Sequence, residues 1–170
     1  MRNKKLYQKK INSPIGMLIA MATDEAIYVV DFLDNLSWHL DQAIVLKHLG
    51  ATNVDRENDL LLQLEQQLKE YFAKERKEFS LPIQFVGTPF QEEVWKVLQT
   101  IPYGKTISYK EEAVAIGNPK AARAVANANG KNRLSIIVPC HRVIGNDGGL
   151  GGYTGGITRK AYLLKLENGL

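Results

Sequence analysis

The chain has 170 residues, of which 45% are hydrophobic, and a single cysteine, Cys140. This length suits one domain or two small ones, and a lone cysteine excludes an internal disulfide and a zinc site built from several thiolates. The N-terminus lacks the apolar run of a signal peptide, and no stretch approaches the roughly 18 apolar residues of a membrane span. We therefore expect a cytoplasmic protein without membrane attachment. We also expect that it binds no metal and no cofactor and is a monomer in solution.

The net charge of +4 is unevenly distributed along the chain. Residues 1–87 carry 11 Lys or Arg against 12 Asp or Glu, whereas residues 88–170 carry 11 against 6, so the second half has a net charge of +5. Between Asn118 and Lys160 the only acidic residue is Asp147. Such an excess favours a polyanionic partner, although a solvated basic surface accounts for the charge equally well.

The first 35 residues have the composition of β-strands separated by turns. Short turn signals lie between the apolar runs, which predicts an antiparallel three-stranded sheet. The predicted strands are Leu6–Ile11, Met17–Ala22 and Ala26–Phe32.

Two helices are predicted to follow the strands. The first begins after Ser37, a plausible N-cap, and stops at Gly50. In the second, apolar residues recur at helical spacing from Leu61 to Phe72, and this apolar face is expected to cover the sheet. The character of the chain changes near Pro82, which places a domain boundary between residues 82 and 83.

The second half contains clear helix-start signals. Thr88 to Gln91 and Ser108 to Glu111 both have the pattern of a capping box, and each predicts a helix. Gly117 is expected to end the second of these helices, and Asn118-Pro119 to begin another at once. Two short helices joined by a tight turn form a helix-turn-helix, and a final helix is predicted from Thr158 to Glu167.

A helix-turn-helix usually places its second helix in a groove of DNA, which would bring Lys120 and Arg123 to the phosphates or bases. The same pattern occurs in helical proteins that never bind DNA. The basic excess in this part of the chain favours nucleic acid.

Cys140 lies in the segment Pro139-Cys140-His141-Arg142-Val143, at the end of an apolar run. An inert, buried side chain is the commoner role of a lone intracellular cysteine. Here a titratable base follows directly, and Arg142 adds positive charge that would stabilise a thiolate. Because adjacent side chains of an extended segment point in opposite directions, proton transfer from Cys140 to His141 would need a turn or a bridging water.

The segment from Pro139 to Val143, together with Gly152-Tyr153-Thr154-Gly155-Gly156, resembles the methylated-DNA–protein-cysteine methyltransferases, also called O6-alkylguanine-DNA alkyltransferases. The resemblance covers essentially the whole second half. The first half is similar to the family only in length and in the order of its strands and helices. The implied fold is α+β: a ribonuclease-H-like domain over residues 1–82, and a mostly helical, winged-helix domain with the helix-turn-helix over residues 83–170.

The resemblance implies DNA repair without turnover. The protein would flip O6-alkylguanine, such as O6-methylguanine, out of duplex DNA and transfer the alkyl group irreversibly to Cys140; O4-methylthymine is a second candidate substrate. His141 corresponds to the base that deprotonates the thiol through a water, and Glu167 to the carboxylate that orients this histidine. Tyr109 corresponds to a phenol beside the base, and a phenol there could donate a proton to the departing guanine.

Further residues correspond to the family's DNA-binding surface and base pocket. Arg123 matches the side chain that fills the gap left by the flipped nucleotide, and Asn132 matches a residue that braces the turn before the active-site segment. The expected DNA contacts are Lys120, Arg123, Ala124, Lys131, Asn132, Arg133 and Arg142. The expected base pocket consists of Val143, Tyr153, Thr154 and Gly155.

Three departures from the family pattern concern the range of alkyl groups accepted and the contacts with DNA. Arg133 stands where the family usually has proline, and Thr154 where serine or alanine is commoner. The segment Ala126 to Lys131 is also atypical. Because Lys131 and Arg133 flank Asn132 beside the predicted recognition helix, they are expected to add phosphate contacts.

Two other classes of protein remain open at this point. A DNA-binding protein without transfer chemistry would keep all its activity after Cys140→Ser. A Cys-His hydrolase would turn over many times, and its histidine is normally distant in sequence from the nucleophile.

Overall fold

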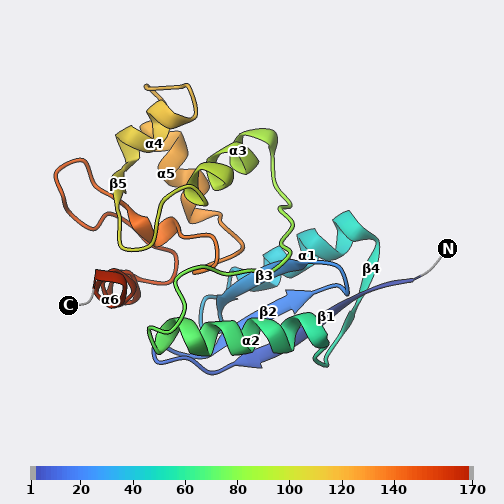
Figure 1. Ribbon diagram of the computed structural model, residues 1–170. Helices are drawn as coiled ribbons and strands as arrows, with labels where there is room; N and C mark the ends of the chain where they lie inside the picture. The colour runs from blue at the N-terminus through green and yellow to red at the C-terminus, as the bar shows by residue number, and fades with distance from the viewer. Residues whose placement is uncertain (1–2, 169–170) are drawn as a thin grey trace. The chain divides into compact units, whose positions relative to one another are not determined.

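The computed structural model describes residues 3–168 and divides the chain into two compact units, with the division after Val86 (Figure 1). The sequence-based division after Pro82 falls slightly earlier. Ile83 forms a bridge with Ile27, and Val86 packs into the hydrophobic core of the first unit. The segment that follows Pro82 therefore belongs to the first unit. No helix of the described chain is both long and apolar enough to cross a membrane.

The first unit contains a four-stranded sheet in the order β3-β2-β1-β4. Neighbouring strands are antiparallel except that β4 pairs parallel to β1. The strands are β1 (Lys4–Ile11), β2 (Leu18–Ala22), β3 (Ile27–Phe32) and β4 (Ala51–Val54). The α+β class is confirmed, but the predicted number of three strands was wrong. The short β4 has exposed Thr52 and Asn53 at its centre, and its partner β1 is distant in sequence, so no local pattern marks it.

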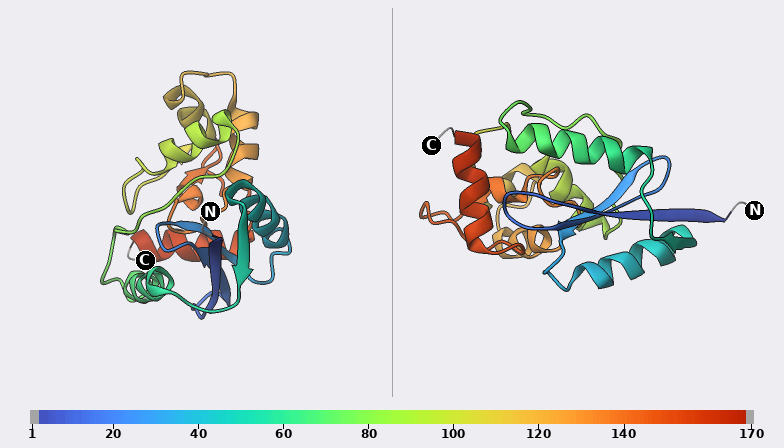
Figure 2. Two further views of the ribbon diagram at one scale, coloured as in Figure 1. Left: turned by 90° about the vertical axis from the view of Figure 1, so that its right-hand side faces the viewer. Right: turned by 90° about the horizontal axis from the view of Figure 1, so that it is seen from below.

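Two helices cover opposite faces of this sheet (Figure 2). Helix α1 (Trp38–Leu49) follows Ser37 and ends at Gly50, whose φ of 61° is the left-handed conformation that glycine adopts easily. Helix α2 (Asp59–Phe72) is capped by the Asn58 side chain, which accepts a hydrogen bond from the Leu61 N–H at 3.0 Å. Because helices cover both faces, every residue of β2 is buried, which explains its continuous apolar sequence.

The second unit is mostly helical, as predicted. Its elements are α3 (Pro89–Leu98), β5 (Ile107–Ser108), α4 (Tyr109–Ala115), α5 (Ala122–Gly130), the 3₁₀ turn η1 (Cys140–Arg142), β6 (Val143–Ile144) and α6 (Ile157–Asn168). Both capping boxes are confirmed: the side chain of Thr88 accepts from the Gln91 N–H at 3.1 Å, and that of Ser108 from the Glu111 N–H at 3.0 Å.

Helices α4 and α5 form the helix-turn-helix, although α5 begins later than predicted. Gly117 (φ 80°) and a turn closed by the Ala121 N–H on the Asn118 carbonyl at 3.0 Å separate them. Lys120 therefore lies in the turn and not on the second helix. The buried indole of Trp95 in α3 donates to the Ala128 carbonyl at 2.9 Å and so fixes α5 against α3.

A short parallel pair connects the helix-turn-helix to the cysteine segment. Ile107 of β5 pairs with Val143 of β6, and Ser108 pairs with Ile144. Because η1 directly precedes β6 and α4 directly follows β5, this pairing brings Cys140 and Tyr109 into one region of the unit.

Candidate active site

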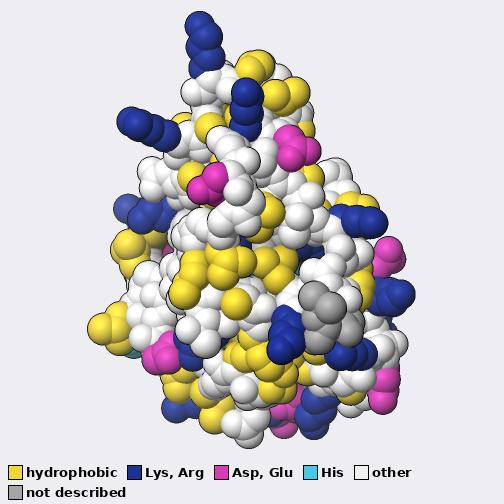
Figure 3. All heavy atoms as spheres, turned by 90° about the vertical axis from the view of Figure 1, so that its left-hand side faces the viewer, with side chains coloured by type: hydrophobic (Ala, Val, Ile, Leu, Met, Phe, Trp, Pro, Cys, Tyr) yellow, Lys and Arg dark blue, Asp and Glu magenta, His cyan; other side chains and the backbone are white. Residues whose placement is uncertain are grey.

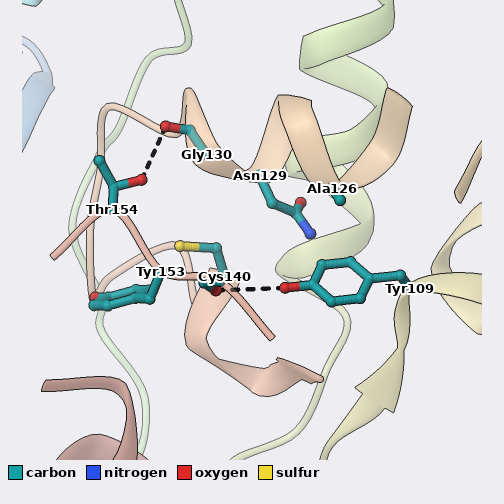
Figure 4. A pocket seen from close by; sticks show the side chains of 8 residues that line it. Tyr109, Ala126, Asn129, Gly130, Cys140, Tyr153 and Thr154 are labelled. Atoms are coloured by element: carbon teal, nitrogen blue, oxygen red, sulfur yellow. Dashed lines mark hydrogen bonds between the residues drawn. The ribbon is translucent and has the colours of Figure 1, made fainter. Parts of the chain in front are cut away.

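A pocket of about 250 Å³ opens beside Cys140 (Figure 4). Helices α4 and α5, the turn η1 and the glycine-rich loop before α6 all contribute to its wall. The lining residues are Tyr109, Ala126, Asn129, Gly130, Cys140, Gly152, Tyr153 and Thr154. Cys140 is 7% exposed and lines this pocket.

Buried hydrogen bonds of Asn132 hold the segment that leads to Cys140. Its Nδ2 donates to the Val138 carbonyl at 2.9 Å, and its Oδ1 accepts from the Leu134 N–H at 3.0 Å. The backbone then enters a 3₁₀ turn in which the Arg142 N–H donates to the Pro139 carbonyl at 3.0 Å. Cys140 and His141 are therefore not in the extended conformation that would direct their side chains oppositely.

His141 and Arg142 share the carboxylate of Glu167, and all three residues are buried. The Nε2 of His141 lies 2.7 Å from Oε2 of Glu167, and Arg142 donates through Nε to Oε1 at 2.8 Å and through Nη2 to Oε2 at 3.0 Å. Burial alone would raise the pKa of Glu167, but hydrogen bonds from His141 and Arg142 outweigh it and lower this pKa to about 2. Glu167 is therefore ionised at neutral pH.

The ionised carboxylate fixes the tautomer of His141. Burial lowers the pKa of His141 more than Glu167 raises it, so the imidazole is neutral at neutral pH. A carboxylate can only accept, which means that Nε2 carries the proton and Nδ1 carries the lone pair. Nδ1 is buried and has no hydrogen-bond partner among the described residues. It is a base with its lone pair available.

Lys160 contributes a buried ammonium group, although in the sequence it counted only toward the basic excess of the second half. It is 0% exposed, and its Nζ donates to the Val143 carbonyl at 2.6 Å, the Gly152 carbonyl at 3.0 Å and the Tyr109 hydroxyl at 3.5 Å. Burial lowers the pKa of Lys160 to about 8. The missed signal was its spacing: Lys160, Leu163 and Glu167 lie on one face of α6, and all are buried.

The thiol and the phenol that line the pocket are both protonated at rest. Burial raises the pKa of Cys140 to about 11, and the Asn132 hydrogen bond and the charge of Lys160 offset this only in part. Burial also raises the pKa of Tyr109, whose hydroxyl donates to the Gly152 carbonyl at 3.4 Å. Formation of a thiolate therefore requires a base, and Tyr109 holds a proton that it can donate.

Both halves of the chain match models of one protein family. Residues 6–85 match the ribonuclease-like domain of 6-O-methylguanine DNA methyltransferase, and residues 89–169 match its DNA-binding domain. The chain belongs to the 6-O-methylguanine DNA methyltransferase family. The family resemblance inferred from the sequence is thereby confirmed.

Relatives and solved structures agree with this membership. The chain is 44% identical over 162 residues to the constitutive methylated-DNA–protein-cysteine methyltransferase of Bacillus subtilis, covering 95% of this chain and 94% of the relative. It is 41% identical to that of Methanosarcina acetivorans, covering 95% and 98%. The crystal structure of Mycobacterium tuberculosis OGT in complex with DNA superposes with a TM-score of 0.82 at 43% identity, covering 96% of this chain and 93% of that one.

Two of the expected DNA contacts in this methyltransferase form hydrogen bonds within the protein. Arg142 is buried, and its guanidinium donates to Glu167 and, through Nη1 at 2.7 Å, to the Ile101 carbonyl. Asn132 is also buried, and its amide braces the backbone. Both residues are nearly buried and bonded within the protein, which gives each a structural role, and a contact of either with DNA stays a prediction. The cation that lowers the pKa of Cys140 is Lys160, not Arg142.

The other expected DNA contacts lie at or near the surface around α5. Lys120, Arg123, Ala124 and Lys131 are exposed, and Arg133 is half-buried. Lysine and arginine side chains project from the upper end of the view in Figure 3, the end that carries α4 and α5 in Figure 1.

The expected base-pocket residues divide into two groups. Tyr153 and Thr154 line the pocket, and the Thr154 hydroxyl donates to the Gly130 carbonyl at 2.9 Å (Figure 4). Val143 and Gly155 are not among the lining residues; the Val143 carbonyl binds Lys160, and the Gly155 carbonyl accepts from Arg159.

The contribution of α5 to the pocket was not predicted from the sequence. Ala126, Asn129 and Gly130 line it, and their spacing of three and four residues places them on one side of the helix. That spacing was readable, but no residue type in it indicated a ligand. Residues 3–168 contain no cluster of three or more His, Cys, Asp or Glu side chains that could hold a metal ion.

Proposed function

We propose that this methyltransferase repairs DNA by flipping O6-alkylguanine into the pocket and transferring the alkyl group irreversibly to the sulfur of Cys140. The observation that carries the proposal is the neighbourhood of Cys140: a pocket beside the thiol, and next in sequence a neutral histidine with a free Nδ1 and an ionised carboxylate on Nε2. The DNA complex of the related M. tuberculosis protein supports DNA as the partner.

Base flipping would provide the first selection step. An alkyl group on the Watson-Crick edge weakens base pairing, so the lesion costs only a few kcal/mol to extrude and less than an intact guanine. The exposed Arg123 of α5 is suited to occupy the vacated space in the duplex. The remaining exposed cations around α5 would bind phosphates.

The chemical step is a displacement at the alkyl carbon. His141 Nδ1 accepts the Cys140 proton through a bridging water, and the thiolate attacks. The S–C bond forms, the C–O6 bond breaks, and its electron pair remains on the guanine. Tyr109 then protonates the guanine, and Lys160, whose Nζ lies 3.5 Å from the Tyr109 hydroxyl, returns a proton to the phenolate.

The product explains why each molecule would act once. A thioether has no carbonyl for water to attack, and the chain has no second cysteine to displace the alkyl group. An unpaired reactive thiol also requires a reducing environment, which favours the cytoplasm. O6-methylguanine is the primary substrate we propose, with O4-methylthymine as a further candidate, and the protein would act as a monomer.

The mass of the intact protein after incubation with duplex DNA containing O6-methylguanine tests this proposal. We expect one methyl group per molecule, located on Cys140 by peptide mapping, and a reaction that stops at one product per protein. The matched controls are the same duplex with unmodified guanine and the variant Cys140→Ser, neither of which should gain mass. Continued turnover would indicate a hydrolase, and methylation at another residue would exclude Cys140 as the acceptor.

A further inference from the structure

One buried acidic residue of the second unit has no role in the chemistry described above. Glu112 lies on α4 and is 0% exposed. Its Oε1 accepts a hydrogen bond of 2.7 Å from Nδ2 of Asn129, which is 6% exposed and lines the pocket beside Cys140. In Figure 4 the Asn129 amide lies between Ala126 and Cys140. Glu112 therefore lies directly behind a wall residue of the pocket.

The second oxygens of this pair lack partners. Oε2 of Glu112 and Oδ1 of Asn129 are both buried, and neither has a hydrogen-bond partner in the described part of the chain. Two acceptors cannot bond to each other, and a buried acceptor without a donor costs free energy. One added proton resolves both defects. A neutral carboxyl can donate from Oε2 to Oδ1 while Oε1 accepts from Nδ2, which closes a cyclic acid–amide pair.

The charges around Glu112 also favour the neutral form. The elements packed against α4 are α3, α5, β5 and β6, and within residues 3–168 none of them supplies a cation that pairs with Glu112. The titratable groups that face it are Tyr109 on its own helix and Cys140 of η1. Burial raises the pKa of Glu112 to about 7, more than the Asn129 hydrogen bond lowers it.

An ionised Glu112 would oppose the reaction at the pocket. Its negative charge raises the pKa of both Cys140 and Tyr109. Alkyl transfer requires a thiolate at the first of these residues and proton donation by the second. A carboxylate behind the pocket wall makes formation of the Cys140 thiolate less favourable, whereas a neutral acid–amide pair does not.

We propose that Glu112 is a positioning residue for alkyl transfer: its carboxyl is protonated in the reactive pocket, closes a cyclic pair with Asn129, and slows the reaction of Cys140 when it ionises. This inference rests on the proposed function in naming alkyl transfer as the reaction. Its effect on the thiol itself can be measured without DNA.

The decisive variant is Glu112→Gln, because a glutamine amide can form the same two hydrogen bonds with Asn129 but carries no charge. The matched control is Glu111→Gln, which removes an exposed negative charge next to it while glutamine preserves the capping box. Cys140 is the only cysteine, so the rate of alkylation by iodoacetamide reports on this thiol alone. The rate is measured for each protein from about pH 5.5 to about pH 8.5, on either side of the expected titration.

The quantity to compare is the ratio of the Glu112→Gln rate to the wild-type rate at each pH. Titration of Cys140, His141, Tyr109 and Lys160 is common to both proteins and largely cancels. We expect a ratio near one at the acidic end, rising by on the order of tenfold at the alkaline end, since one unit of pKa corresponds to tenfold in thiolate. The Glu111→Gln ratio should stay near one throughout.

A Glu112→Gln ratio that is constant with pH would overturn the proposal, because a purely structural role changes the rate by the same factor at every pH. The single-turnover rate of methyl transfer from O6-methylguanine DNA should show the same rising ratio. A ratio that rises for iodoacetamide but stays flat for methyl transfer would also overturn it. If the wild-type protein failed to accept methyl groups at all, the proposed function would be wrong, and the iodoacetamide ratio would still decide the protonation of Glu112.

Discussion

Glu112 and Glu167 are two buried glutamates of the same unit, at 0% and 6% exposure, and their pKa values shift in opposite directions. Glu167 accepts hydrogen bonds from His141 and Arg142, and its pKa falls to about 2. Glu112 is bonded only to a neutral amide, and its pKa rises to about 7. Burial alone raises the pKa of both glutamates, so the hydrogen-bond partner decides the direction of the net shift.

This difference suits the two positions. An ionised carboxylate on the far side of His141 stabilises the imidazolium that forms when the histidine takes the Cys140 proton. An ionised carboxylate behind Asn129 would instead face the developing negative charge. One pocket can therefore be supported by two identical side chains only if one is charged and the other is neutral.

Neutralising Glu167, the charged glutamate, should have the largest effect on stability and on the transfer rate. In Glu167→Gln, Arg142 loses its anionic partner while buried, and His141 loses the group that fixes its tautomer. We expect the free energy of unfolding to fall by about 3–5 kcal/mol. The single-turnover transfer rate should fall by about 10²–10⁴-fold, the usual contribution of a positioned base. Urea unfolding and rapid-quench kinetics measure the two effects.

Glu93→Gln, which alters an exposed residue of α3, is the control for Glu167→Gln and should change neither quantity. If Glu167→Gln kept both its stability and its rate, the ionic network would be dispensable and the contrast between the two glutamates would lose its functional meaning.

Replacement of Glu112, the neutral glutamate, should change the stability of the fold in the opposite direction. The pKa of Glu112 is raised from 4.5 to about 7 in the folded state. The carboxyl therefore destabilises the fold as pH rises through this interval, and the full loss of stability is reached above about pH 7. Glu112→Gln should therefore be more stable than wild type by up to about 3 kcal/mol near pH 8, with the advantage disappearing below about pH 4.5.

Urea unfolding at several pH values tests this prediction, with Glu111→Gln as the control. Glu167 titrates in a separate window: its lowered pKa stabilises the fold above about pH 4.5, and this contribution is lost as pH falls toward about 2. If the extra stability of Glu112→Gln over wild type increased as the pH fell, Glu112 would not be neutral in the folded protein.

Lys160 extends the comparison to a buried cation. Because its pKa is about 8, the wild-type transfer rate should decline above this pH as the ammonium loses its proton and no longer supports Tyr109 and the Cys140 thiolate. Lys160→Met should be slower by about tenfold to a hundredfold near neutral pH and should lack the alkaline decline. Lys165→Met alters an exposed lysine of the same helix and should retain the wild-type profile. An alkaline decline that persists in Lys160→Met would assign it to another group.

Local signals in the sequence predicted most of the fold. The capping boxes at Thr88 and Ser108 lie within four residues each, so the sequence specifies these helix starts directly. Strand β4 could not be predicted in this way, because it is defined by its parallel pairing with the distant β1.

The roles of the charged residues depended on burial, which composition does not reveal. Arg142 was expected to contact DNA and Lys160 was counted only in the basic excess, yet both are buried against polar partners. Helical spacing with Leu163 and Glu167 could have identified Lys160. The capping-box spacing from Ser108 identified Glu111, but no local pattern showed that Glu112, the next residue, would be buried.

The smallest predicted effect concerns charges that remain at the surface. Lys131 is exposed and Arg133 half-buried, beside α5. Each cation that neutralises a phosphate releases bound counterions, so the double change Lys131→Ala and Arg133→Ala should weaken binding and reduce the slope of log affinity against log salt by about 2. Fluorescence anisotropy with a labelled duplex at several salt concentrations measures the slope. The control is Lys47→Ala with Lys69→Ala, two exposed lysines of the first unit, which should leave it unaltered. An unchanged slope in the Lys131 and Arg133 double variant would mean that these two cations do not contact the DNA backbone. The exposed residues of α5 itself would then make the phosphate contacts.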